Sequence, residues 1–319
     1  MRRTAKFLLF LPLIAIASLP ACQRAAPPAA PARPVAASKV AAASAIASAA
    51  STTAATASGA VGDDLETLMR AAFPAWKPGQ PQVLVVPHDQ YPDKTRTVAV
   101  QPSMVVAIDK AHRALVTVGR PSDENGEDAS AHADPGMVGV YLFERRTDHW
   151  IKTKAQDAAT WQGSSGEVGD VKVIELGSGH RALLVEGGFT GQGETTVGAD
   201  VVEIEPAGAR VVLSGLPLHE DTFGAANLFC EEWVSGERTP TSADLADPDT
   251  EACQAYTGTW RVERAADAGR GDFVVAYKFR RTVDDAKSHS KRFEASERTV
   301  VFRYGPSGYV KLSGELPKY

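Results

Sequence analysis

The residue types that carry chemistry are spread thinly along this chain. The most compact polar cluster is His219-Glu220-Asp221, which places an imidazole beside two carboxylates. Such groups are the usual machinery for proton transfer, so this is where the sequence would put acid–base catalysis. The other histidines are scattered, and no His-Glu-x-x-His pattern occurs. The sequence therefore names no catalytic residue, predicts no metal or cofactor, and favours a protein that is not an enzyme.

A glycine-rich stretch, residues 186–194, is a second candidate. A phosphate-binding loop would continue into Lys-Ser or Lys-Thr and then into a helix. Here the chain continues into Thr195-Thr196-Val197, which is typical of a strand, so we interpret the stretch as a hairpin loop. The alternative is a ligand loop in which Phe189, Gln192 and Glu194 contact a sugar or a peptide.

Acidic residues gather at two further places. The run from Asp123 to Asp128 offers alternating oxygens that suit Ca²⁺, but its glycine comes two residues too early for the known calcium loop. We interpret this run as a solvated loop. Glu231 and Glu232 are adjacent, and adjacent strand residues point to opposite faces, so they cannot share one glycoside. Arg270-Gly271-Asp272 matches an adhesion tripeptide, but so short a match arises easily by chance.

The amino terminus has the parts of an export signal. A short basic segment, residues 1–6, precedes an apolar run from Phe7 to Leu19. This run has about 13 residues, whereas a membrane-spanning helix needs about 20. The run closes with Leu19-Pro20-Ala21-Cys22. These features predict a signal peptide over residues 1–21, and one interpretation is an ordinary secretory signal with a chance cysteine after it.

Leu-x-Ala-Cys at the end of an apolar run resembles the lipobox of bacterial lipoproteins. The resemblance implies cleavage after Ala21 and acylation of Cys22, which would anchor the protein in a membrane. Pro20 departs from the usual small or β-branched residue of that motif. The residue after the cysteine is Gln23 rather than Asp. In this class of lipoprotein that difference implies an outer-membrane location facing the periplasm.

Residues 22–60 are almost entirely Ala, Pro, Ser and Thr, a composition that predicts a disordered spacer. All 39 acidic residues lie after residue 60, whereas six of the 34 basic residues precede it, which leaves residues 61–319 with a net charge of −11. Because phosphate binding depends on Lys and Arg, this charge argues against a nucleic-acid partner.

Two cysteines remain if Cys22 carries lipid. Cys230 and Cys253 form an even pair in an oxidising compartment, so we predict a disulfide between them. Two free thiols, or a pair of metal ligands, are the alternative. No second Cys or His lies near either cysteine at the spacing of a metal site.

The 61–319 segment is predicted to be one mainly β, antiparallel domain with a single amino-terminal helix. The helix begins at Asp63 with a capping box to Glu66, and Pro74 ends it. After it, short apolar runs alternate with Gly, Asp and Pro turns, and the links are too short for parallel crossovers. We expect the aromatic residues to lie mostly in the core and some of them to line a recognition surface: Trp150, Trp161, Trp233, Trp260, Tyr256 and Tyr309.

A short repeat suggests a modular β domain. His112-Arg113-Ala114-Leu115 and His180-Arg181-Ala182-Leu183 both open a predicted strand at the same place in the strand pattern. The pattern divides into three four-stranded meander units, with chance similarity as the alternative: residues 104–154, 171–214 and 256–313. Such units would form either an incomplete propeller or a long curled sheet.

Together these patterns predict a lipid-anchored outer-membrane lipoprotein whose β domain binds or scaffolds an envelope protein or the cell wall. Its membrane contact would be the lipid on Cys22. The alternative is a hydrolase of envelope polymers or an enzyme inhibitor. An enzyme would gather a histidine or two carboxylates from different strands into a cleft, whereas a binding protein would present an aromatic or apolar surface.

Overall fold

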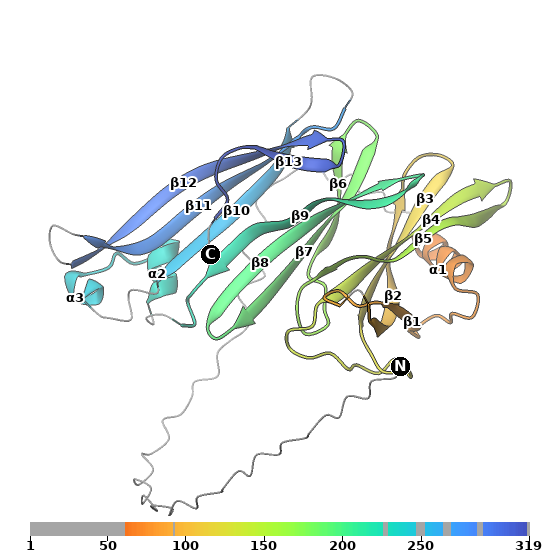
Figure 1. The fold of residues 1–319 in the computed structure, drawn as a ribbon, viewed down its shortest axis with the longest axis horizontal. Helices are drawn as coiled ribbons and strands as arrows, with labels where there is room; N and C mark the ends of the chain where they lie inside the picture. The colour runs from red at the N-terminus through yellow and green to blue at the C-terminus, as the bar shows by residue number, and fades with distance from the viewer. Residues whose placement is uncertain are drawn as a thin grey trace, which may run out of the picture. The chain divides into compact units, whose positions relative to one another are not determined.

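The computed structural model describes residues 61–91, 93–225, 229–246, 253–263, 269–285 and 290–317. The predicted signal peptide, spacer and Cys22 lie outside these residues. Within them the chain is mainly β, with two antiparallel sheets and three short helices, which confirms the predicted fold class (Figure 1). None of the described helices is long and apolar enough to cross a membrane.

The predicted helix is α1 (Val61–Ala72), and it packs on a sheet through one apolar side. It begins at Val61 rather than at the predicted cap Asp63, which lies within its first turn. Leu68 and Met69 are fully buried against Tyr141 and Phe143 of that sheet. At the last turn Lys152 donates to the carbonyl of Ala72 at 2.8 Å. A cation there satisfies an otherwise unpaired carbonyl and complements the negative end of the helix dipole.

The first sheet is a five-stranded meander in which each strand pairs with the next one in the sequence. Its strands, in spatial order, are β1 (Gln82–Pro87), β2 (Thr95–Ala107), β3 (His112–Pro121), β4 (Gly136–Arg146) and β5 (His149–Gln162).

The second sheet has eight strands, again in sequence order, and it is curled into a half-barrel. Its strands are β6 (Val171–Gly177), β7 (His180–Gly191), β8 (Glu194–Glu205), β9 (Gly208–Asp221), β10 (Gln254–Glu263), β11 (Asp272–Asp285), β12 (Ser290–Gly305) and β13 (Gly308–Ser313).

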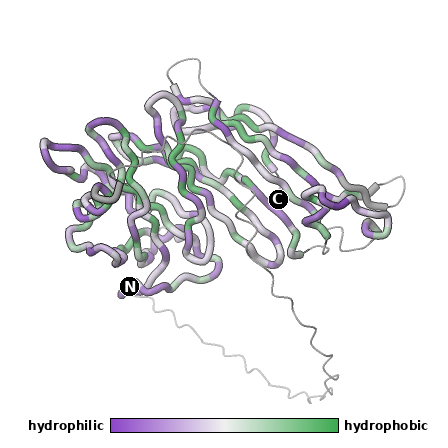
Figure 2. Tube along the Cα trace, turned by 180° about the vertical axis from the view of Figure 1, so that it is seen from behind, coloured by the Kyte–Doolittle hydropathy of each residue, from purple (hydrophilic) through white to green (hydrophobic). Residues whose placement is uncertain are grey.

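Because side chains alternate along a strand, the two faces of each sheet pack against different parts of the protein. On β7, Leu183 and Val185 pack against the first sheet, whereas Ala182 and Leu184 face the core of the half-barrel. On β3 the residues of one face meet α1 and those of the other meet the second sheet. Both sheets are therefore covered by packed apolar side chains, and Figure 2 shows the hydrophobic residues concentrated along the strands.

The two copies of the repeated tetrapeptide lie at equivalent places in the two sheets, each at the start of a strand. His112 and His180 each begin a strand, β3 and β7, after a tight turn. The β8–β9 and β12–β13 hairpins share a further likeness, because residues 201–215 and 300–314 both begin with Val-Val and end with Leu-Ser-Gly. The last two predicted units are not separate, since β9 pairs with β10 and joins them into one sheet. The result is a curled sheet rather than a propeller.

The connection between β9 and β10 carries two short helices, α2 (Cys230–Ser235) and α3 (Ser242–Leu245). The predicted disulfide is present here and links Cys230 to Cys253 across a sequence separation of 23. Both cysteines are fully buried beside Trp233. The disulfide therefore links the start of α2 covalently to the residue just before β10.

Candidate functional site

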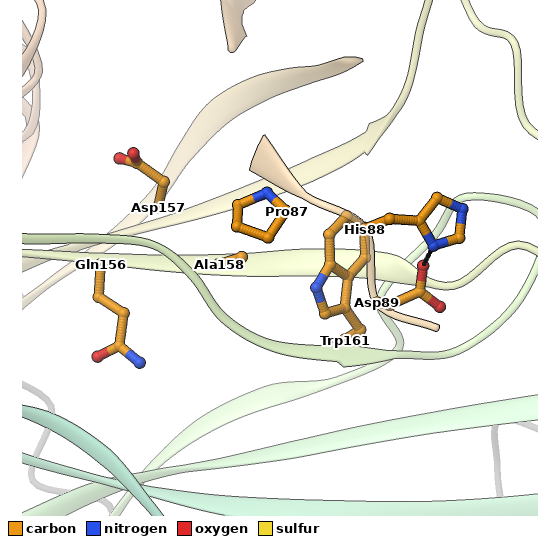
Figure 3. Close-up of a pocket in the computed structure, with 7 residues that line it drawn as sticks. All are labelled: Pro87, His88, Asp89, Gln156, Asp157, Ala158 and Trp161. Atoms are coloured by element: carbon orange, nitrogen blue, oxygen red, sulfur yellow. Dashed lines mark ion pairs between the residues drawn. The ribbon is translucent and has the colours of Figure 1, made fainter. Parts of the chain in front are cut away.

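A pocket of about 370 Å³ lies between the end of β1 and the edge strand β5 (Figure 3). Seven residues line it: Pro87, His88, Asp89, Gln156, Asp157, Ala158 and Trp161. Its size falls within the range of small-molecule sites. Asp89 of the turn after β1, Asp157 of β5 and the Trp161 indole thus line the same cavity, and the two carboxylates lie on opposite sides of the indole ring (Figure 3).

The β5 wall exists because this strand bulges. Val138 of β4 pairs with Thr160, but the next paired residue, Val140, faces Gln156, so β5 has two residues more than β4 in this interval. The bulge needs room over Gly139, where an added Cβ would lie 2.8 Å from the carbonyl oxygen of Asp157. Bulges of this kind commonly re-aim side chains beside functional sites. Here the bulge contributes Asp157 and Ala158 to the pocket.

The β1 wall begins where the strand stops. Pro87 lacks an N–H group, and after it His88 and Lys94 close a turn with a 3.0 Å backbone hydrogen bond. This turn holds the Asp89 side chain in the pocket wall with only 10% of its surface exposed. Pro87 therefore marks the point at which the chain leaves the sheet, and the polar residues His88 and Asp89 follow it directly in the pocket wall.

Asp89 is the least satisfied polar group of the pocket. Its Oδ1 atom is buried and has no hydrogen-bond partner among the described residues. His88 Nδ1 lies 3.0 Å away and Arg96 Nη1 lies 3.5 Å away, at ion-pair distance but without hydrogen-bond geometry. Arg96 instead donates to Asp134 at 2.8 Å, and its guanidinium carbon lies 5.8 Å from the Trp161 ring centre.

Tyr141 lies fully buried near Asp157. Burial raises the pKa of its phenol well above the usual range, and the negative charge of Asp157 adds to the increase. The phenol therefore stays protonated, as a neutral donor beside that carboxylate. Tyr141 is not one of the residues that line the pocket, and its ring packs with the α1 residues Leu68 and Met69.

The predicted ligand loop is the β7–β8 hairpin. Gln192 and Gly193 form its two-residue turn with φ of 54° and 86°. The Phe189 ring packs against His132 with 5.3 Å between ring centres, while Gln192 and Glu194 are exposed. None of the three residues lines the pocket at β1 and β5. Their role in ligand binding stays a prediction.

The predicted acid–base cluster has more order than the sequence implied. His219 Nε2 lies 2.8 Å from Asp221 Oδ2, and His219 Nδ1 lies 3.3 Å from Thr257 Oγ1 on the paired strand β10. Carboxylate, imidazole and hydroxyl in this order resemble the relay of acyl-transfer enzymes. Glu220 stands beside them, and burial raises its pKa above the usual value. These residues line neither the pocket at β1 and β5 nor the cavity between β2 and residues 166–171.

One group of possible metal ligands is found among the described residues, on β7 and β8 of the second sheet. His180, Glu203 and Glu205 offer atoms within 4.8 Å of one another. However, the Glu203 carboxylate already accepts from Arg270, Arg210 and Tyr304, and Arg270 also binds Glu205. Two guanidinium groups occupy the place of a cation, so this cluster is an ion-pair network around the buried Glu203, whose other members are partly exposed.

Two other sequence motifs are absorbed by the fold. Arg270 and Asp272 of the Arg-Gly-Asp tripeptide are engaged by Glu203 and Arg303, the latter at 2.8 Å. In the acidic run, Asp123 Oδ1 accepts from the backbone of Asn125 at 2.8 Å and of Glu127 at 2.9 Å. Both motifs therefore stabilise local structure.

Fold and site together define a two-sheet antiparallel β protein with a half-barrel and a small acidic pocket on the other sheet. No protein-family model, no curated protein and no solved structure matches this chain.

Proposed function

We propose that this protein is a lipid-anchored binding protein of the bacterial cell envelope, with its recognition site in the pocket between β1 and β5. The observation that carries the binding role is the pocket of about 370 Å³ itself, in which the Trp161 indole lies beside the apolar Pro87 and Ala158 (Figure 3). A cavity of this size with an aromatic wall is typical of a small-molecule site.

The pocket is better suited to binding than to catalysis. The indole of Trp161 supplies a flat apolar wall, and polar side chains line the cavity from the turn after β1 and from β5. Aromatic walls with a few placed polar groups are typical of recognition sites. This role also agrees with the predicted spacer, which would let the domain reach ligands away from the membrane.

A thermal-shift screen of small polar ligands with the mature protein tests the binding role. We expect at least one ligand to raise the unfolding temperature of the wild type and to lose this effect in Trp161→Leu. Trp150→Leu is the matched control, because Trp150 packs beside α1 and outside the pocket. A ligand response that survives unchanged in Trp161→Leu would contradict the proposed site.

The anchor is tested separately by labelling cells with a radioactive fatty acid. Cys22 should carry the label, and Cys22→Ser should lose it and release the protein from the membrane fraction. Label retained in Cys22→Ser would contradict the anchor without affecting the pocket.

A hydrolase of envelope polymers is the second candidate, and the His219, Asp221 and Thr257 arrangement favours it. If Thr257 were a nucleophile activated by His219, then Thr257→Val and His219→Ala would both abolish hydrolysis of peptidoglycan or of ester substrates. Equal activity in wild type and both variants would exclude this relay.

A further inference from the structure

We infer that Ser165 is an activated nucleophile that reacts with carboxylic esters, with His132 as its base and the Thr190 carbonyl as the group that orients the base. None of these three residues lines the pocket between β1 and β5. The inference therefore goes beyond the proposed binding role and does not depend on it.

Two connections and the end of one strand bring these residues together. His132 lies between β3 and β4, Ser165 lies between β5 and β6, and Thr190 lies near the end of β7. Ser165 Oγ lies 3.3 Å from His132 Nδ1, and His132 Nε2 lies 2.9 Å from the Thr190 carbonyl oxygen. A hydroxyl, an imidazole and an orienting acceptor in this order are typical of an activated nucleophile. The residues around Ser165 do not match the Gly-x-Ser-x-Gly elbow, so the geometry carries the assignment.

The Thr190 carbonyl determines which nitrogen of His132 carries the proton. A carbonyl oxygen only accepts, so the hydrogen bond requires the proton on His132 Nε2. The neutral ring then has its lone pair on Nδ1, on the side of Ser165. The Ser165 hydroxyl therefore donates in this contact, and its other nearby acceptor, at 3.4 Å, is the backbone carbonyl of the same histidine. The base is thus in the tautomer that can take the serine proton.

The turn around Ser165 holds the hydroxyl in a sparsely populated conformation. Ser165 has a φ of 54°, and the nearby Gly163 and Gly166 have φ of 87° and 74°. Residues other than glycine rarely adopt this left-handed region, and those that do cluster at functional sites. The Ser165 N–H donates to the His132 carbonyl at 2.9 Å, and the Gly166 N–H donates to the Asp134 carbonyl at 2.7 Å. The serine and its base are therefore held together by the backbone as well as by their side chains.

The surroundings of Ser165 favour small, activated esters. Ser165 and His132 are both exposed, so an ester carbonyl can reach the hydroxyl. The Phe189 ring, with 5.3 Å between its centre and that of His132, is 38% exposed and offers apolar surface to an acyl or alkyl group. The N–H groups of Ser165 and Gly166 are used within the turn, so water must solvate the oxyanion. Because a preorganised oxyanion site usually supplies the largest part of the rate, we expect slow hydrolysis.

The reaction balances with water as the second reactant. The Ser165 oxygen bonds to the ester carbonyl carbon while its proton passes to His132 Nδ1. The tetrahedral intermediate then expels the alcohol, which leaves with that proton, and an acyl ester of Ser165 remains. Water attacks this acyl ester and gives a proton to His132, which returns it to the Ser165 oxygen as the acid departs.

Labelling of the mature protein with a fluorophosphonate probe, followed by peptide mass spectrometry, tests the nucleophile, and hydrolysis of p-nitrophenyl acetate tests the reaction. We expect the probe on Ser165 and hydrolysis above the buffer rate. Ser165→Gly should lose both, and glycine suits the positive φ, so the turn should still form. His132→Ala should slow the labelling about tenfold or more. Ser164→Ala is the matched control, because it removes the neighbouring hydroxyl from the same turn, and it should behave like the wild type.

The absence of probe on Ser165, or labelling that His132→Ala leaves unchanged, would overturn the inference. Labelling of Thr257 in place of Ser165 would overturn it in favour of the relay at His219. Labelling of Ser165 without ester hydrolysis would overturn the assigned reaction. Trp161→Leu should leave the labelling unchanged, so a failure at Ser165 is distinguishable from a failure of the proposed binding pocket.

Discussion

Thr160 of β5 donates its hydroxyl hydrogen to Asp200 of β8, and this hydrogen bond joins the two sheets through their buried interface. The two side chains belong to residues that are 7% and 4% exposed. The second Asp200 oxygen accepts from the backbone N–H of Gly215 at 2.8 Å. Because the surrounding contacts between the sheets are apolar and not directional, this pair fixes one alignment of the interface.

Removing the acceptor should destabilise the interface. Asp200→Ala leaves the Thr160 hydroxyl and the Gly215 N–H without their partner, and we expect the free energy of unfolding to fall by about 1–3 kcal/mol. Urea denaturation measures this change. Thr160→Val and the double variant complete a cycle, in which the two losses should be less than additive. Strict additivity would show that the two side chains do not act as a pair.

The Glu203 network should make stability depend on acidity. Burial alone raises the pKa of Glu203, but hydrogen bonds from Arg270, Tyr304 and Arg210 outweigh it and hold the pKa below the usual value. The unfolded chain then binds this proton more readily than the folded chain. The contribution is therefore complete above the unfolded pKa of about 4.3, and it is lost as pH falls through the folded pKa.

We expect the urea midpoint of the wild type to fall as the pH is lowered from neutral into this acidic range, and Glu203→Gln to show a shallower fall. Tyr304 should remain a donor throughout, because burial and Glu203 raise its pKa to about 12. Glu124→Gln, in an exposed loop, serves as the control. Parallel pH profiles for wild type and Glu203→Gln would disprove the assignment.

The disulfide should contribute mainly through the unfolded state. Closing a loop with a sequence separation of 23 is worth about 3 kcal/mol in the chain-entropy model. The double variant Cys230→Ala with Cys253→Ala should lose about this amount relative to the oxidised wild type, as measured by chemical denaturation. Reductant should lower the stability of the wild type but leave that of the variant unchanged. A response of the variant to reductant would point to another cause.

The bulge that builds the pocket can be tested at Gly139. In Gly139→Ala the new Cβ would lie 2.6 Å from Thr117 Oγ1 and 2.8 Å from the Asp157 carbonyl oxygen. We expect a loss of about 1–3 kcal/mol and weaker ligand binding, because Asp157 must move. Gly208→Ala is the control, since nothing lies within 4 Å of its added Cβ. If calorimetry gave the same unfolding temperature for both variants, the crowding argument would fail.

The fold could largely be predicted from the sequence because its signals are local. The helical spacing of Leu65, Leu68 and Met69 predicted α1, and alternation with turn residues predicted the strands. The predicted cap at Asp63 was wrong, because the helix begins two residues earlier, at Val61. The pairing of Cys230 with Cys253 followed from counting. The pairing of β9 with β10, which joins two predicted units into one sheet, could not be predicted. It consists of three residue pairs between strands that are far apart in the sequence, so no local pattern marks it.

The pocket could not be predicted, because it forms where the end of β1 meets β5 and depends on a bulge of β5 against β4. Trp161 was among the aromatics expected in the core or at a recognition surface, but nothing marked Asp89, Gln156 or Asp157. Their position depends on a bulge in β5 that is permitted by a glycine on the neighbouring strand β4. The residue pattern of one strand does not reveal which side chains of a neighbouring strand will lie beside it. The His219 cluster could be recognised in the sequence because Glu220 and Asp221 directly follow the histidine. The contact with Thr257 could not, because it arises only when β9 pairs with β10.

In both sheets every strand hydrogen-bonds to the strand that precedes or follows it in the chain. Among the described strands, only β9 and β10 pair across a long connection, so a chain that becomes available from its amino terminus can otherwise add one strand at a time to a growing sheet. Long-range pairing is what slows most all-β proteins, because loop closure must come before the contacts that reward it. This architecture therefore suits stepwise assembly from the amino terminus as the polypeptide is synthesised, with the half-barrel completed last by β13.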